Sequence, residues 1–429
     1  MSPSPSEDAA RLDTPATADA APARRPRFGL LARVLTGIVL GIVLGLIAPD
    51  WLARTAATFA GLFSGFLGFI VPVLILALVA PAIAELGRGA GRWLGLTAAI
   101  AYASTVFGGF LGLAAGLAVF PHLLTPGSIS SVTDPTAGQA EAFFTVEMAP
   151  PFGVMTALVL AFVMGIGMTL IPRGTLQHGF EELRSIVEKV ISGVIVPLLP
   201  FYVFATFLTM AAAGGVAEVV LTFLGVIALV FVLTLVLLLV QFAVAGAVAR
   251  RNPFTALRAM LPAYATALGT SSSAATIPVT LRQVGTLGVR RPVASFVVPL
   301  AATIHLAGST VKIVSFSLAV LVLSGQAVDV PVMIGFIFML GITMVAAPGV
   351  PGGAIVAASG LLASMLGFTE PQVALMVATY LAIDSFGTAT NVTGDGAIAL
   401  IVDRVAGDRI TAATGGAGPT EPTGLTTAD

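Results

Sequence analysis

The sequence contains no cysteine and only three histidines, and each shortage excludes a class of protein. Without cysteine there is no disulfide framework, no thiol nucleophile and no thiolate metal ligand. The histidines, His122, His178 and His305, lie far apart in the chain, which argues against a histidine-rich metal site. A net charge of −1 gives no electrostatic reason to bind nucleic acid.

Charge is also scarce. Only 10% of the 429 residues are charged, whereas an average soluble domain has about 25% charged residues. Hydrophobic residues make up 57% of the chain, and the mean hydropathy is +1.02. This composition predicts an all-α polytopic membrane protein.

Apolar runs of about 20 residues or more can each span a bilayer, and six of them follow one another in the first part of the chain. Two later runs are long but interrupted by polar residues and glycine. The six uninterrupted candidates lie near 28–49, 56–84, 92–120, 150–172, 186–212 and 216–249, and the two interrupted ones near 292–323 and 372–404.

Two further segments, 254–285 and 334–366, are too broken to be plain spanning helices. The first contains GTSSSAATIP (269–278) and the second APGVPGGA (347–354). Unwound backbone at membrane depth is tolerated only where protein buries it or where it lines a polar cavity. We therefore expect two re-entrant helical hairpins, which together with interrupted helices are typical of a transporter's central binding site.

The arginines indicate the topology. They gather in alternate loops, while the intervening loops 121–149, 213–215 and 324–333 contain no lysine or arginine and Arg54 is the exception. The positive-inside rule then gives eight crossings with both termini cytoplasmic, in the cell membrane. The arginines alone also allow one crossing for each broken segment, and the serine-rich and proline-glycine tips favour hairpins. Residues 1–27 and 406–429 are expected to be disordered tails.

The last apolar run carries a polar stripe. In a helix, Asp384, Thr388, Asn391 and Asp395 fall at i, i+4, i+7 and i+11, which is one face. A carboxylate at the bilayer centre costs about 2.5–3.5 kcal/mol on insertion scales. Two carboxylates on one stripe therefore favour a functional site, although a buried structural network is the alternative.

Four motifs in order resemble the dicarboxylate/amino acid:cation symporter family, which includes the glutamate transporters. They are DSFGTATNVTGD (384–395), SSSAATIPVT (271–280), GVPGG (349–353) and PLAATIHLAGST (299–310). The resemblance covers about 28–405 and implies a homotrimer that moves a transport core like an elevator. Residues 28–250 would supply helices 1–6, mostly scaffold with helices 3 and 6 moving with the core, and 251–405 the rest of the core.

The resemblance also implies roles for individual residues. Asp384 would hold the ammonium group of an amino acid and Asn391 its α-carboxylate. The implied substrate-binding positions are Ser272, Ser273, Ser309, Gly349, Asp384, Gly387, Thr388 and Asn391. The implied cation-binding positions are Ala301, Thr303, His305, Val345, Ala347, Asn391 and Asp395.

The sequence departs from the family pattern at Gly387, where members that carry acidic substrates have an arginine. Without a guanidinium, a second carboxylate on the substrate lacks its bidentate partner. We therefore expect a small neutral amino acid as substrate, with acidic amino acids or C4-dicarboxylates as the alternative.

A second departure concerns the coupling ion. The family pattern Asn-Met-Asp-Gly-Thr is here His305-Leu306-Ala307-Gly308-Ser309, which should damage a third sodium site. Lys312 lies deep in the same run and could replace a bound cation or carry the coupling proton. Both Na⁺ and H⁺ therefore stay open, and no other cofactor is expected. His305 could equally be a packing residue, and Lys312 could simply pair with a carboxylate. A third departure, Pro348, removes a backbone donor from the second hairpin.

Two other functions compete with symport. An intramembrane hydrolase would need a serine within hydrogen-bond reach of His305, and the chain has neither a GxSxG nor an HExxH motif. A passive channel is disfavoured by two discontinuous hairpins. No nucleotide-binding signature is present in the sequence, so ATP-driven transport is not indicated.

Overall fold

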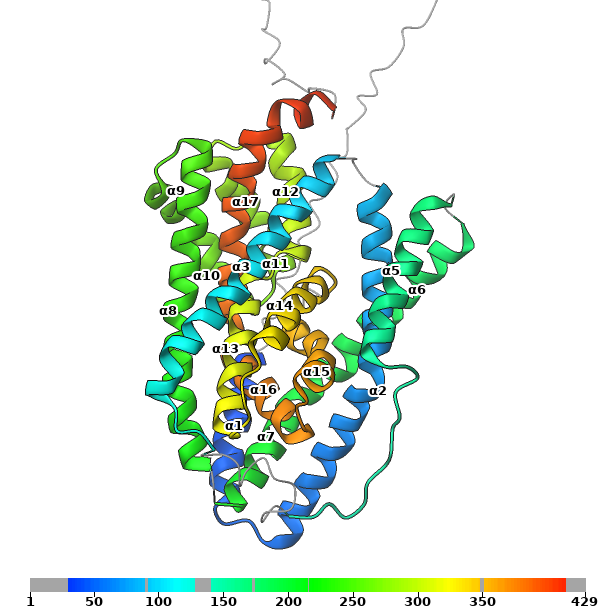
Figure 1. The fold of residues 1–429 in the computed structure, drawn as a ribbon, viewed down its shortest axis with the longest axis vertical. Helices are drawn as coiled ribbons and strands as arrows, with labels where there is room; N and C mark the ends of the chain where they lie inside the picture. The colour runs from blue at the N-terminus through cyan, green and yellow to red at the C-terminus, as the bar shows by residue number, and fades with distance from the viewer. Residues whose placement is uncertain are drawn as a thin grey trace, which may run out of the picture.

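The computed structural model describes residues 30–88, 92–127, 140–171, 174–214, 216–347 and 351–413, and every regular element in these ranges is a helix (Figure 1). The elements are α1 (Leu30–Gly45), α2 (Asp50–Arg88), α3 (Arg92–Leu123), α5 (Val154–Leu170), α6 (Thr175–Val190), the π-helical turn η1 (Ile191–Ile195), α7 (Val196–Ala212), α8 (Val216–Ala249), α9 (Pro253–Ala259), α10 (Leu261–Thr270), α11 (Ser273–Thr286), α12 (Arg291–Ile304), α13 (Ala307–Leu323), α14 (Val330–Val345), α15 (Gly353–Leu366), α16 (Glu370–Ala382) and α17 (Asp384–Ala413).

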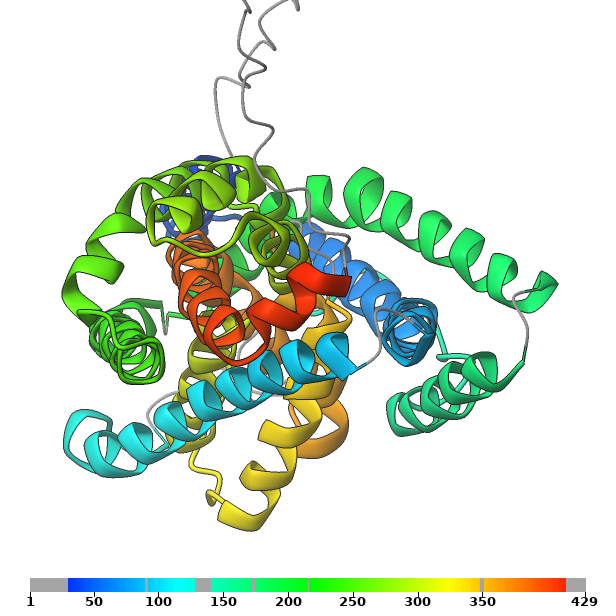
Figure 2. The same cartoon turned by 90° about the horizontal axis from the view of Figure 1, so that it is seen from above.

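One group of helices is built on close contact between α1 and α7 and between α2 and α5. Gly37, Gly41 and Gly45 repeat every four residues along α1 and let the backbones approach; a Cβ at Gly41 would lie 2.6 Å from the Phe204 carbonyl oxygen. Viewed from above, α5 and α6 stand at the periphery beyond α2 (Figure 2). The sequence prediction assigned these helices to a scaffold.

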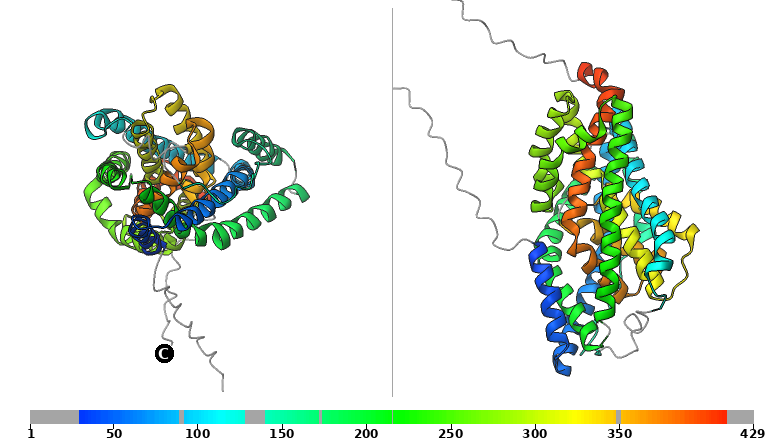
Figure 3. Two further views of the ribbon diagram at one scale, coloured as in Figure 1. Left: turned by 90° about the horizontal axis from the view of Figure 1, so that it is seen from below. Right: turned by 90° about the vertical axis from the view of Figure 1, so that its left-hand side faces the viewer.

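The second group surrounds α17, which packs against α8, α10, α11, α12 and α13 (Figure 3). α3 packs along α13. Helices 3 and 6 of the sequence prediction (α3 and α8) therefore contact the second group, in which the predicted polar stripe is buried.

Both broken segments double back as hairpins. In hairpin 1, α10 and α11 pack together around Ser271, whose φ of 50° turns the chain, and Ser272 caps α11. In hairpin 2, α14 and α15 pack together, and Gly352 precedes α15 with φ 76°. The chain also breaks between α12 and α13, and α16 and α17 meet at a bend of 63°. The predicted all-α fold with interrupted helices is confirmed.

Two predicted spans are shorter than expected: α1 has 16 residues and α5 has 17. Proline explains the end of α5, because Ile171 is extended (φ −107°, ψ 153°) before Pro172. In the described ranges five helical spans are long and apolar enough to cross a membrane, and the bent pair α16–α17 makes a sixth. With α1 and α5 they account for the eight predicted crossings.

The last helix continues beyond residue 405, where the sequence analysis placed the start of a disordered tail, and it ends at Ala413. Arg290, just before α12, explains the extension. Its Nε lies 3.1 Å from Asp403 Oδ1 and its Nη1 pairs with Asp408, so two turns of α17 are tied to α12. Residues 1–29 and 414–429 lie outside the described ranges.

Candidate functional site

The Asp384 carboxylate is buried where α17 begins, directly after the bend at Ile383. Its Oδ2 accepts a hydrogen bond of 2.8 Å from the Gly352 backbone N–H in hairpin 2. Its Oδ1 lies 3.4 Å from Lys312 Nζ in α13. The buried carboxylate thus joins hairpin 2 to the broken helix α12–α13, and it does not face lipid.

Lys312 is fully buried, with 0% of its surface exposed. Besides Asp384, its ammonium donates to the Ile383 carbonyl oxygen at 3.4 Å and lies 3.7 Å from the centroid of the Tyr380 ring. A cation over an aromatic face is stabilised by the ring quadrupole. The lysine therefore pairs with a carboxylate inside the protein and does not snorkel to the surface.

Gly387 lies beside the lysine stem. A Cβ at this position would overlap with Lys312 Cε and Nζ. The space that a side chain of residue 387 would occupy is therefore taken by an ammonium from α13. Gly387 brings no positive charge of its own, as expected from the sequence, but Lys312 of α13 places an ammonium group beside it.

Asn391 sits one helical turn below Gly387 and faces the start of α13. Its Oδ1 accepts from the backbone N–H groups of Gly308 (2.8 Å) and Ser309 (3.3 Å), and its Nδ2 donates to Ser309 Oγ (3.1 Å). Tyr380 donates its hydroxyl to the same Ser309 Oγ at 2.9 Å. Asn391, Ser309 and Tyr380 form one buried network next to the Asp384–Lys312 pair.

Asp395 is the last residue of the stripe along α17, and its carboxylate contacts His305. His305 Nδ1 lies 2.9 Å from Asp395 Oδ1, and His305 Nε2 lies 3.0 Å from Ser104 Oγ. Gln241 Nε2 donates to that serine oxygen at 2.8 Å. Since the serine oxygen accepts from Gln241, its hydrogen is free to go to His305 Nε2, which places the ring proton on Nδ1 toward Asp395.

Hairpin 1 reaches the same region through its tip. Ser271 Oγ donates to Ser385 Oγ at 3.0 Å, next to Asp384. Ser272 is the N-cap of α11, and Ser273 is 5% exposed. The start of α11, with the backbone N–H groups of its first turn, is thereby held near the start of α17. Gly349 and Pro348, in the tip of hairpin 2, lie outside the described residues.

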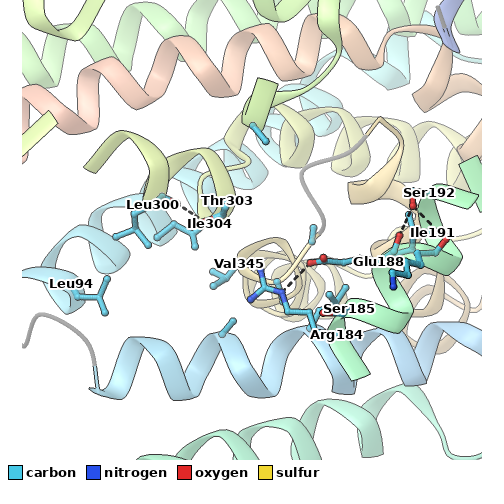
Figure 4. A pocket seen from close by; sticks show the side chains of 16 residues that line it. Leu94, Arg184, Ser185, Glu188, Ile191, Ser192, Leu300, Thr303, Ile304 and Val345 are labelled. Carbon is cyan, nitrogen blue, oxygen red and sulfur yellow. Dashed lines mark hydrogen bonds and ion pairs between the residues drawn. The ribbon is translucent and has the colours of Figure 1, made fainter. Parts of the chain in front are cut away.

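A cleft of about 680 Å³ separates the two groups of helices (Figure 4). Thr303 and Ile304 at the end of α12 face it from one side, and Arg184 and Glu188 of α6 from the other. Val345, Ala346 and Ala347 of hairpin 2 and Ala274 of hairpin 1 also line it. The cleft therefore reaches both hairpin tips.

A family model described as the sodium:dicarboxylate symporter family matches residues 30–405. The chain belongs to the sodium:dicarboxylate symporter family. It is therefore a multi-pass membrane protein of a secondary transporter family, as the sequence resemblance indicated. The match covers both helix groups and all four motifs.

The symporter brings most predicted substrate positions into one buried region. Asp384, Gly387 and Asn391 face α13, and Ser309 bonds to Asn391. Thr388 is buried, and its hydroxyl donates to the Asp384 carbonyl oxygen. Their roles in binding substrate remain proposals.

The predicted cation positions fall into two sets. Thr303, Val345 and Ala347 line the cleft together. Asn391 and Asp395 belong to the buried stripe, His305 contacts Asp395 from the break between α12 and α13, and the Ala301 carbonyl accepts the His305 N–H at 2.9 Å. In the second set Asp395 Oδ1 and Asn391 Oδ1 already accept hydrogen bonds from the protein, and in the first set the Thr303 hydroxyl donates to the Leu300 carbonyl oxygen at 2.7 Å.

Three residues that contact the site were not predicted from the sequence: Tyr380, Ser385 and Gln241. Tyr380 and Gln241 lie in apolar runs where a single polar residue carries no signal of its own. Ser385 follows Asp384 directly and points to hairpin 1 because the bend at Ile383 starts a new helix. Only the three-dimensional contact between distant segments identifies them.

Proposed function

We propose that this chain is a secondary symporter that imports a small neutral amino acid by an elevator mechanism. The supporting observation is the Asp384 carboxylate, which sits between a backbone N–H of hairpin 2 and a buried ammonium. A place that holds the ammonium of Lys312 has the charge and size for the α-ammonium of an amino acid.

The other groups fit the rest of a zwitterion. The α-carboxylate would lie near Asn391 Nδ2 and the N–H groups at the first turns of α11 and α13, where helix dipoles favour negative charge. Ser309 and Thr388 would border the side chain. Because Lys312 fills the space at Gly387, the substrate side chain must be small.

Hairpin 2 would serve as the lid, since Gly352 contacts Asp384 and the tip borders the cleft. The core around α17 would then slide as a unit along the scaffold of α1, α2, α5 and α7, in a homotrimer with both termini cytoplasmic. The cleft between the groups is consistent with a movable contact, because a fully packed interface would resist sliding.

The proposed coupling ion is sodium, bound between Thr303 and the carbonyl groups around Val345 and Ala347. Oxygen ligands at a hairpin tip suit a hard cation, and the family description names sodium. A proton is the competing candidate, because His305 and Lys312 stand beside the carboxylates of the stripe.

Acidic amino acids or C4-dicarboxylates form the second candidate substrate class. Lys312 places its ammonium where acidic-substrate members of the resembled family carry an arginine, so a second carboxylate would find a cation. Against this, the ammonium is already engaged by Asp384.

One geometric observation supports the alternative of an intramembrane hydrolase. Ser104, His305 and Asp395 line up with the hydrogen bonds of a serine-hydrolase triad. Ser104 lies in the middle of α3, however, and its oxygen accepts a hydrogen bond from Gln241, so it is not presented at a strained turn as a nucleophile. Membership of a transporter family favours symport.

The test is uptake into proteoliposomes of a panel of labelled neutral amino acids, acidic amino acids and dicarboxylates, with sodium and proton gradients imposed separately. The proposal expects concentrative uptake of a small neutral amino acid driven by an inward sodium gradient. Uptake of dicarboxylates alone would contradict the substrate, and uptake driven by the proton gradient alone would contradict the ion.

A further inference from the structure

Lys312 pairs with the carboxylate to which the substrate should bind, and the roles considered for it so far do not explain this pairing. We propose that Lys312 is a tethered cation that takes the place of the substrate ammonium on Asp384 when the site is empty, so that hairpin 2 can close over an empty site. This inference rests on the proposed function.

The contacts of Asp384 show the closed, lysine-filled arrangement. One carboxylate oxygen accepts the Gly352 N–H of hairpin 2, and the other faces Lys312 Nζ. The lid thus contacts the carboxylate while the lysine supplies the positive charge. A substrate ammonium would take the position of Lys312 Nζ and leave the contact with Gly352 in place.

Charge balance gives the physical reason. A symporter must return its empty core across the bilayer after each delivery. A buried carboxylate without a counter-ion is strongly disfavoured there, because it has lost its hydration and gained nothing in exchange. With Lys312 paired to Asp384, the empty core carries no uncompensated charge at this position and needs no cation from solution.

The geometry also allows the lysine to leave. Its distances to Asp384 Oδ1 and to the Ile383 carbonyl are both 3.4 Å, longer than the roughly 2.7–2.9 Å of a strong charge-assisted hydrogen bond. The Tyr380 ring, 3.7 Å from Nζ, also stabilises the ammonium and does so without the carboxylate. The flexible stem passes the open side of Gly387, where no side chain obstructs it.

The experiment separates return of the empty core from transport of the loaded core. Net uptake is measured in proteoliposomes without internal substrate, and exchange in proteoliposomes preloaded with the same unlabelled amino acid. In Lys312→Met a bound substrate still neutralises Asp384, but the empty site has no cation. We expect the ratio of net uptake to exchange to fall at least tenfold, and Lys312→Arg to keep more of that ratio than Lys312→Met.

Two further variants guard against misfolding and unspecific effects. Lys312→Gln keeps a hydrogen-bond donor for Asp384 without the charge, and we expect the same fall in the ratio. Ser317→Ala removes a buried hydroxyl of α13 that, among the described residues, donates to the Ile313 carbonyl of its own helix, and it should leave the ratio unchanged.

The outcomes distinguish failure of the tethered-cation proposal from failure of the proposed function. If net uptake and exchange fall equally in Lys312→Met and Lys312→Gln while amino-acid transport by the unmodified protein is intact, the tethered-cation proposal is wrong and the proposed function stands. If the unmodified protein transports dicarboxylates and no amino acid, or nothing in the panel, both fail, because a substrate without an ammonium cannot replace the lysine on Asp384.

Discussion

Lys312 fills the space that a side chain at Gly387 would need, so the two positions, on α13 and α17, must be read together. The glycine is not a vacancy in the substrate site. It makes room for a lysine whose ammonium pairs with Asp384, one helical turn before it. The absence of a side chain at 387 therefore decides whether the Lys312 ammonium can lie in the site and how much space is left beside it.

An arginine at position 387 should change selectivity only if the lysine is shortened as well. Gly387→Arg alone overlaps with the Lys312 stem, and we expect a loss of about 1–3 kcal/mol in stability, as for other overpacked positions. In Gly387→Arg with Lys312→Ala, the guanidinium can take the freed space. The ratio of aspartate to alanine uptake should then rise at least tenfold over that of Lys312→Ala alone; an unchanged ratio would remove Gly387 from the specificity site.

Restoring two residues of the family pattern should strengthen the response to sodium. His305→Asn with Ala307→Asp returns an amide and a carboxylate at the break between α12 and α13, and carboxylate oxygens are good ligands for hard cations. The sodium concentration that gives half-maximal uptake should fall severalfold. The matched control is His305→Asn alone, which lacks the added carboxylate. Equal sodium responses in the two variants would show that a carboxylate at position 307 takes no part in binding sodium.

Gly308 is expected to be required for contact between α13 and α17. A Cβ there would lie 2.7 Å from Thr390 Cβ and 2.8 Å from the Gly387 carbonyl oxygen. Gly308→Ala should therefore lower stability by about 1–3 kcal/mol. Thermal unfolding in detergent measures it. The control is Gly285→Ala in α11, where a Cβ meets nothing within 4 Å and stability should hold or improve. A Gly308→Ala protein as stable as this control would show that the two helices can separate at no cost.

The row Ser104–His305–Asp395 should not act as a nucleophilic triad. Gln241 holds the serine oxygen within a regular helix, so a serine-directed fluorophosphonate probe should label the unmodified protein no more than Ser104→Ala. Labelling that disappears in Ser104→Ala would favour the hydrolase over the symporter for this row.

Most of the fold could be predicted from local patterns in the sequence. Apolar run length located the spans, and the serine-rich and proline-glycine interruptions located the hairpins, because backbone conformation there follows directly from those residues. The stripe on α17 needed only helical periodicity. Helix ends were less predictable: α1 stops early at Gly45, α5 stops before Pro172, and α17 is extended by Arg290 pairing with Asp403 and Asp408.

The pairing inside the site could not be predicted in the same way. Lys312 meets Asp384 across 72 residues, and His305 meets Asp395 across 90. Which carboxylate Lys312 or His305 meets depends on how α12 and α13 lie against α17, and no local pattern specifies that register. The reading of Gly387 as a position without positive charge was incomplete for this reason.

The most direct test of the account is amino-acid uptake by Asp384→Asn, with thermal unfolding measured on the same preparation. The asparagine keeps the size and an oxygen for Gly352 but removes the charge that holds an ammonium. We expect uptake to fall at least about thirtyfold, because losing one member of a buried charge pair costs about 2–5 kcal/mol of binding. A folded Asp384→Asn protein that accumulates the neutral amino acid at the rate of the unmodified protein would contradict the central claim that Asp384 holds the substrate.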